Sequence, residues 1–82
     1  MKYIEGRFQR WRALAIYSNG DEGLLCLGDT YTEVKETYHI PYFELLQENE
    51  RKGVRLIQLQ RWNGKANYGY WENQLVLDKP RV

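Results

Sequence analysis

The chain contains few of the residue types on which catalytic and metal sites depend. Its 82 residues include one cysteine, Cys26, and one histidine, His39. A single cysteine excludes an internal disulfide framework and is typical of a protein of the reducing cytoplasm. A single histidine can supply neither a Ser-His relay nor a histidine metal cluster within one chain. We therefore expect no metal site and no cofactor.

Long hydrophobic runs are also missing. No stretch approaches the ~20 apolar residues of a membrane helix, and the first residues carry no apolar core of a signal peptide. These absences predict a cytoplasmic protein without a membrane partner. At 82 residues and 9.9 kDa, the chain is expected to form one domain over residues 1–82, with a polar tail at residues 78–82.

The remaining titratable residues do not form a recognisable catalytic pattern. Cys26 lies in the apolar segment Leu24–Leu27, where burial leaves a thiol protonated and unreactive. His39 stands close to a proline and is typical of a turn residue rather than a general base. The carboxylates of Glu44 and Glu48 fall on a helix face that is expected to be solvated. The sequence therefore predicts that the protein is not an enzyme.

Charge is sorted along the chain, although the net charge is only +1. Residues 21–50 hold eight acidic side chains against Lys35, whereas residues 1–12 and 51–82 are basic. Such runs usually mark solvated faces, which is the interpretation we favour. In the alternative, the two basic ends form an anion-binding face. The pI of 7.8 is well below that of a strongly basic nucleic-acid-binding domain.

A first hairpin is predicted in the N-terminal third of the chain. Residues 8–17 are rich in strand-forming side chains, and Asn19-Gly20 supplies the positive φ that a tight turn requires. Residues 24–27 then predict a short second strand that is buried on both faces.

Residues 30–40 fit two structures. The segment from Thr30 to Glu33 matches a capping box, which would begin a helix near residue 31. The density of threonine, tyrosine and valine instead favours a strand. We favour the strand, which would be the third of the sheet.

The clearest element is a helix predicted between Pro41 and Gly53. Proline suits the first helical position, while Arg51 and Lys52 complement the dipole of the last turn. Gly53 supplies a stop. The face expected to pack on the sheet carries Tyr42, Leu45, Leu46 and Asn49.

A second hairpin is predicted over residues 54–77, with a two-residue loop at Asn63-Gly64. This register gives favourable cross-strand pairs. The predicted pairs are Arg55 with Glu72, Leu56 with Trp71, Ile57 with Tyr70 and Leu59 with Tyr68. The fold class is therefore α+β: a small, four- to five-stranded, mostly antiparallel sheet with one main helix, in the order β-β-(β)-α-β-β. A sheet curled into a partial barrel is the alternative.

Aromatic side chains make up 15% of the chain and are its one unusual feature. The second hairpin carries large side chains on both faces, and one helix can cover only one of them, so an aromatic patch is expected to remain for a partner. We predict a non-enzymatic binding module that acts by protein–protein contact, with a second copy of the chain, forming a homodimer, as the simplest partner. The predicted contact residues are Trp62, Tyr68, Tyr70 and Trp71.

An alternative function is the binding of single-stranded nucleic acid by a basic and aromatic sheet face. Rings would stack on bases while cations hold the phosphates. The residues that would make these contacts are Arg7, Arg10, Trp11, Arg12, Arg61 and Lys65. A small-ligand pocket lined by aromatic side chains is a third hypothesis.

Overall fold

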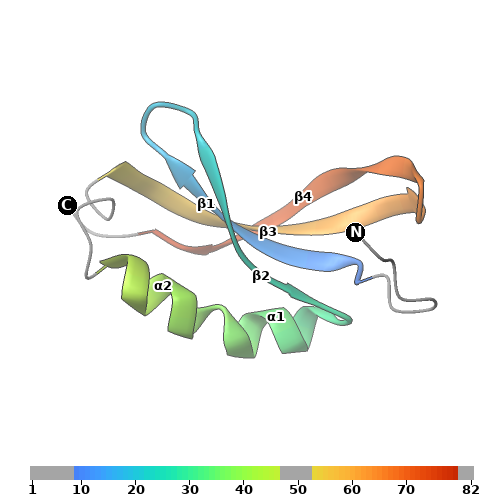
Figure 1. Cartoon of the computed structure of the whole chain (residues 1–82), viewed down its shortest axis with the longest axis horizontal. Helices are drawn as coiled ribbons and strands as arrows, with labels where there is room; N and C mark the ends of the chain where they lie inside the picture. The colour runs from blue at the N-terminus through green and yellow to red at the C-terminus, as the bar shows by residue number, and fades with distance from the viewer. Residues whose placement is uncertain (1–8, 47–52, 80–82) are drawn as a thin grey trace.

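A bent helix covers one face of a four-stranded antiparallel sheet (Figure 1), and this computed structural model describes residues 9–46 and 53–79. The strands are ordered β2-β1-β3-β4 across the sheet, so the two hairpins lie side by side. The elements are β1 (Trp11–Tyr17), β2 (Glu22–Gly28), α1 (Tyr31–Thr37), α2 (His39–Leu46), β3 (Val54–Lys65) and β4 (Tyr68–Asp78). The α+β fold class is confirmed, with four strands and an open sheet rather than a partial barrel.

The first hairpin forms as predicted, between β1 and β2. The N–H of Gly20 donates to the carbonyl of Tyr17 at 2.9 Å, and the N–H of Tyr17 donates to the carbonyl of Asp21 at 2.8 Å. Gly20 has a φ of +96°, a conformation that favours glycine. Burial of the second strand on both faces is wrong, however. Leu24 and Leu27 are exposed, because β2 is an edge strand and the helices cover only one side of the sheet.

The segment after Thr30 forms helix α1, so the third strand that we favoured is wrong and the capping-box alternative is correct. The Thr30 hydroxyl accepts a hydrogen bond from the N–H of Glu33 at 3.1 Å, and the Glu33 carboxylate accepts one from the N–H of Asp29 at 2.8 Å. These bonds satisfy donors that the start of a helix leaves unpaired. Val34 and Tyr38, one helical turn apart, are both buried in the core, and this burial outweighs the strand propensity of the segment.

We expect Thr30→Ala to lower the free energy of unfolding by about 1 kcal/mol, because the N-cap acceptor is lost. Thr32→Ala is the matched control, since Thr32 is an exposed residue inside α1 and alanine is the better helix former. Urea unfolding followed by circular dichroism measures both. Equal destabilisation by the two substitutions would contradict the capping role of Thr30.

The helix predicted from Pro41 begins two residues earlier, at His39, and follows α1 with a bend. Pro41 has no N–H to donate to the carbonyl of Thr37, and its ring crowds that carbonyl, so one straight helix cannot run through this point. The N–H of Tyr42 donates to the carbonyl of Tyr38 at 3.1 Å, so helical bonding resumes at once. The bend lets α1 and α2 both lie along the sheet.

The core lies between the two helices and the sheet face that they cover. On β1 this face carries Ala13 and Ala15, whose small side chains let the helices approach closely. Leu59 and Ile57 lie opposite them on β3. The buried cluster consists of Ala13, Ala15, Val34, Tyr38, Tyr42, Val54, Ile57 and Leu59.

The second hairpin forms, but its predicted register is wrong. The loop is Ala66-Asn67, and Gly64 has its positive φ, +135°, inside β3. The predicted pairs are replaced by Arg61 with Glu72, Trp62 with Trp71, Asn63 with Tyr70 and Lys65 with Tyr68. The predicted register would carry residues 75–77 past the start of β3. The observed one places Leu75 opposite Leu59 and packs Leu77 against the core, so burial overrides turn chemistry.

The predicted polar tail and the predicted end of the helix lie mostly outside the described residues. Asp78 is the last residue of β4 and lies opposite Ile57, so the predicted tail does not begin there. The remaining positions lie outside the described residues: Arg7, the predicted helix end with Asn49, Arg51 and Lys52, and residues 80–82 of the tail.

Candidate contact surfaces

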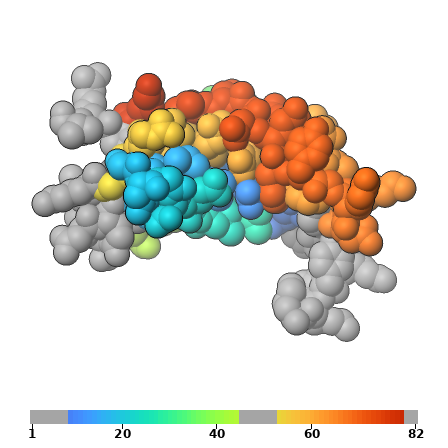
Figure 2. Space-filling view, turned by 90° about the horizontal axis from the view of Figure 1, so that it is seen from above, coloured from blue at the N-terminus to red at the C-terminus, as the bar shows by residue number. Residues whose placement is uncertain are grey.

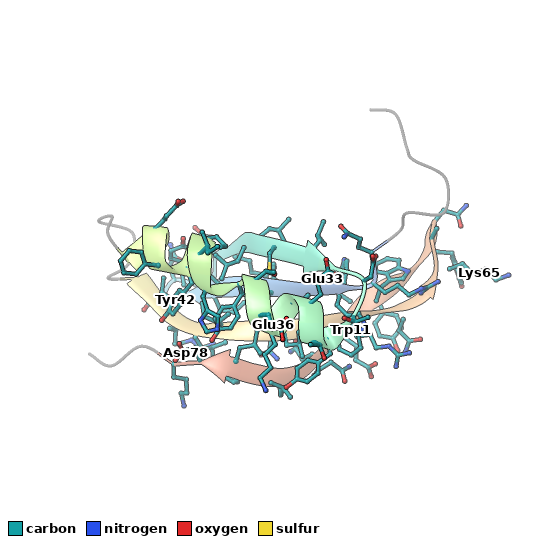
Figure 3. All side chains as sticks on the ribbon, turned by 90° about the horizontal axis from the view of Figure 1, so that it is seen from below. Trp11, Glu33, Glu36, Tyr42, Lys65 and Asp78 are labelled. Carbon is teal, nitrogen blue, oxygen red and sulfur yellow. The ribbon has the colours of Figure 1, made fainter. Side chains whose placement is uncertain are left out.

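The β3–β4 hairpin extends past the end of the helices. Figure 3 shows Lys65 far from the helices and Trp11 beside the end of α1. The guanidinium of Arg61 lies 5.7 Å from the centre of the Trp11 ring, which in turn lies 6.0 Å from the ring of Tyr31 in α1. Arg61 therefore points to the helix side of the sheet.

Strand alternation divides the four predicted contact residues between the two faces of this hairpin. Arg61 is paired with Glu72, so Glu72 also points to the helix side. Tyr70 and Tyr68 lie two and four residues before Glu72 on β4 and therefore point to the same side. Trp62 and Trp71, which are paired with each other, point to the opposite face. The structure therefore brings these residues together in two pairs, back to back, rather than in one patch.

Tyr68 and Tyr70 border a shallow depression of about 460 Å³ near the hairpin tip, which we call the tyrosine groove. Its lining residues are Asn63, Gly64, Tyr68, Gly69 and Tyr70. The exposed fraction is 79% for Tyr68 and 58% for Tyr70, so the expectation that at least one hairpin ring is exposed is confirmed. The Asn63 side-chain amide donates to the Tyr70 hydroxyl at 3.0 Å and holds this ring in place.

The tryptophan pair is packed more tightly. The rings of Trp62 and Trp71 meet edge to face with centroids 5.2 Å apart, and the Trp62 indole N–H donates to the carbonyl of Lys65 at 2.6 Å. A Cβ placed on Gly69 would lie 3.0 Å from the Trp62 ring, so this ring covers the glycine backbone. The guanidinium of Arg12 lies 4.1 Å from the centre of the Trp71 ring. These contacts stiffen the hairpin.

The sheet face opposite the helices, which we call the helix-free face, is mainly apolar over β1 and β2, whereas β3 adds the polar side chains of Gln58 and Gln60. Figure 2 looks onto this face, and strands rather than helices form the visible surface. Its apolar residues are Leu14, Ile16, Leu24, Leu27, Leu56 and Val76, together with Trp62 and Trp71 toward the tip of the second hairpin. Leu24 is 56% exposed, and Leu27 and Val76 are exposed as well. Only Leu14, at the centre of β1, is buried by its neighbours.

The basic residues proposed for nucleic acid do not gather on one face. Arg12 lies on the helix-free face, where its Nε donates to the Gln60 side-chain oxygen at 2.8 Å. Burial lowers the pKa of Arg12, and Glu22 partly offsets this effect. Arg61 lies against Trp11 on the helix side, and Arg10 donates to the carbonyl of Gly64 at 2.7 Å. Lys65 is exposed beside the tyrosine groove.

The two residues with nucleophile or base chemistry lie apart from these surfaces. Cys26 is half-buried on the core side, where the Thr37 hydroxyl donates to its sulfur at 3.6 Å and burial raises the pKa of the thiol. His39 is exposed, with its ring 4.2 Å from that of Tyr38. Within residues 9–46 and 53–79, no group of three or more His, Cys, Asp or Glu side chains is placed to hold a metal ion. No helix in the same part of the chain has the length and apolar character needed to cross a membrane.

A second depression, of about 310 Å³, lies between the first hairpin and α2. Its lining includes Ala15, Leu25 and Pro41, and Tyr17 is the one aromatic residue among the lining side chains. This depression therefore lacks the aromatic walls that the small-ligand hypothesis requires.

Comparison with known proteins finds no matching family model, no similar curated protein and no similar solved structure. The surfaces of the protein are therefore the basis for a proposed function. Sequence reasoning missed the helix-free face, although β1 carries a signal for it. Small Ala13 and Ala15 alternate with larger Leu14 and Ile16, as expected when helices approach one side closely and leave the other open.

Proposed function

We propose that the protein is a non-enzymatic binding module that acts by contact with another protein, through the tyrosine groove of its second hairpin. The observation that carries this proposal is the exposure of Tyr68 and Tyr70 on a hairpin that extends past the helices. Tyrosine supplies a large amphipathic contact area at low entropic cost, which is why it is common in binding surfaces.

The shape of the groove favours an extended peptide segment as the bound part of the partner. Gly64 and Gly69 carry no side chains, so backbone is accessible between the two tyrosine rings. Asn63 is held against Tyr70, so little side-chain freedom remains to be lost on binding. Trp62 and Trp71 support the groove from behind rather than acting as separate anchors.

Single-stranded nucleic acid is less well supported as the ligand. Lys65 is exposed beside the tyrosines, but the two other nearby cations have partners inside the protein, since Arg61 lies on Trp11 and Arg10 is bonded to the backbone of Gly64. Glu72 lies opposite Arg61 on the same side of the hairpin, which reduces the positive potential there. A continuous row of phosphate-binding cations alongside the rings is therefore missing from the described residues.

A library of random peptides displayed on phage, selected against the wild-type protein, tests the proposal. We expect the selected peptides to lose about tenfold or more of their affinity for Tyr70→Ala and for Tyr68→Ala, because the anchor rings are removed. Phe43→Ala is the matched control, since Phe43 is 63% exposed but lies on α2. Fluorescence anisotropy with labelled peptide measures the affinities, and circular dichroism confirms folding.

Selected peptides that bind the tyrosine variants and the wild type equally would contradict the proposal, as would a selection that enriches nothing. Single-stranded DNA and RNA oligonucleotides are measured in parallel. Oligonucleotide binding that weakens steeply with salt, in the absence of peptide binding, would replace the proposal with the nucleic-acid alternative.

A further inference from the structure

The helix-free face lies on the side of the sheet away from the tyrosine groove and needs a separate explanation. Leu24 and Leu27 are exposed on β2, Ile16 is half-buried beside them on β1, and Val76 is exposed on β4 at the opposite edge. Gln58 on β3 separates Val76 from the apolar side chains of β1 and β2. An exposed apolar cluster such as the one over β1 and β2 marks a contact site on a small protein.

The size of this face matches a stable protein interface. The molecule measures 40 × 25 × 20 Å, and Figure 1 looks along its shortest axis with the helices below the sheet, so the 40 Å and 20 Å dimensions lie in the plane of the sheet. They bound a face of about 800 Å², which equals the roughly 800 Å² that each partner buries in a standard interface. The face can therefore accommodate a second sheet of the same size.

Two charged side chains flank the centre of this face. Arg12 precedes Leu14 by two residues on β1, and Glu22 lies opposite Ile16, two residues beyond Leu14. Both therefore point to the helix-free side, at similar distances from Leu14 along the strand and in opposite directions. The face has one positive and one negative end, and at the positive end Arg12 also contacts Gln60 and Trp71 of its own chain.

The twist of the sheet limits how two copies can pack. Figure 1 shows the two hairpins rising away from the helices at opposite ends of the molecule, as expected of a twisted sheet. A twisted surface of this kind fits a second copy of itself when the two are related by a two-fold axis in the plane of the sheet, either along the strands or across them. With the axis along the strands, Glu22 of one copy would lie at the same end of the interface as Glu22 of the other copy. With the axis across the strands, Glu22 of each copy lies at the end where the other copy has Arg12.

We propose that a second copy of this chain covers the helix-free face, with a two-fold axis across the strands and Glu22 of each copy beside Arg12 of the other. The leucines supply the apolar centre of the interface, and the two reciprocal charge pairs fix its orientation. The tyrosine grooves remain open on the outer sides of the dimer. The dimer is thus independent of peptide binding, and either can fail without the other.

Sedimentation equilibrium over a series of protein concentrations tests this arrangement. We expect the wild-type mass to approach twice 9.9 kDa as the concentration rises. Glu22→Arg and Arg12→Glu should each raise the dimer dissociation constant about tenfold or more, because like charges then meet at both ends of the interface. An equimolar mixture of the two variants should restore association, since each supplies the charge that the other has lost.

Two further variants keep this test independent of folding. Glu36→Arg makes the same charge change on the exposed side of α1 and should leave the dissociation constant unchanged. Leu24→Ser removes exposed apolar surface from the face itself and should weaken the dimer about tenfold. A wild-type protein that stays monomeric at all concentrations would overturn the proposal. So would a dimer that is indifferent to both Glu22→Arg and Leu24→Ser.

Discussion

Ile57→Ala should lower the free energy of unfolding by about 3 kcal/mol, because it leaves a cavity at the centre of the core. Ile57 is fully buried between β1 and the helices, opposite Ala15, so no large neighbour on that strand can fill the space. The melting temperature should fall by roughly 15 °C, given the size of the chain. Differential scanning calorimetry gives both quantities.

Ile40→Ala is the control for this substitution. It removes the same atoms from a side chain in α2 that is 69% exposed, and alanine favours the helix. Its effect should be within about 0.5 kcal/mol of zero. Similar losses at the two positions would contradict the placement of the core between the sheet and the helices.

Gly64→Val should lower the free energy of unfolding by about 3 kcal/mol, which is more than is expected for a substitution at an exposed residue. The φ of +135° is unfavourable for a β-branched residue, and a Cβ at this position would meet the carbonyl oxygen of Tyr68 and lie 2.7 Å from the Cα of Gly69. Both obstacles are backbone atoms that cannot move aside. Loss of amide-exchange protection over the hairpin tip should accompany the loss of stability.

Gly20→Ala separates the cost of the positive φ from the cost of the steric clash. Gly20 also has a positive φ, but a Cβ there would have no atom within 4 Å. Only the conformational cost of about 1 kcal/mol should therefore appear. If urea unfolding shows Gly64→Val to be no worse than Gly20→Ala, the close pairing of Gly64 with Gly69 is incorrect.

The elements that could be predicted from the sequence are those whose signals are local. The turn at Gly20 needs only its own residues, and the first hairpin forms there as expected. The α+β class followed in the same way, from strand-rich segments on either side of a punctuated helix.

The predictions that were wrong concern segments whose structure depends on contacts with residues distant in the sequence. Burial of Val34 and Tyr38 against the sheet made a helix of a segment with strand propensity. Packing of Leu75 and Leu77 moved the second hairpin away from the loop that Asn63-Gly64 favours. For the candidate site, composition indicated that hairpin rings would be exposed. Their division into a tyrosine groove and a tryptophan pair depended on strand alternation in the register that the core selects.

The most direct test of the proposed function is to locate a selected peptide on the wild-type protein by amide chemical-shift mapping in NMR. We expect saturable shifts concentrated at Asn63, Gly64 and residues 68–70, with α2 and the helix-free face little affected. Saturable shifts centred on α2 or on Leu24 and Leu27, with the hairpin tip unchanged, would contradict the proposed function.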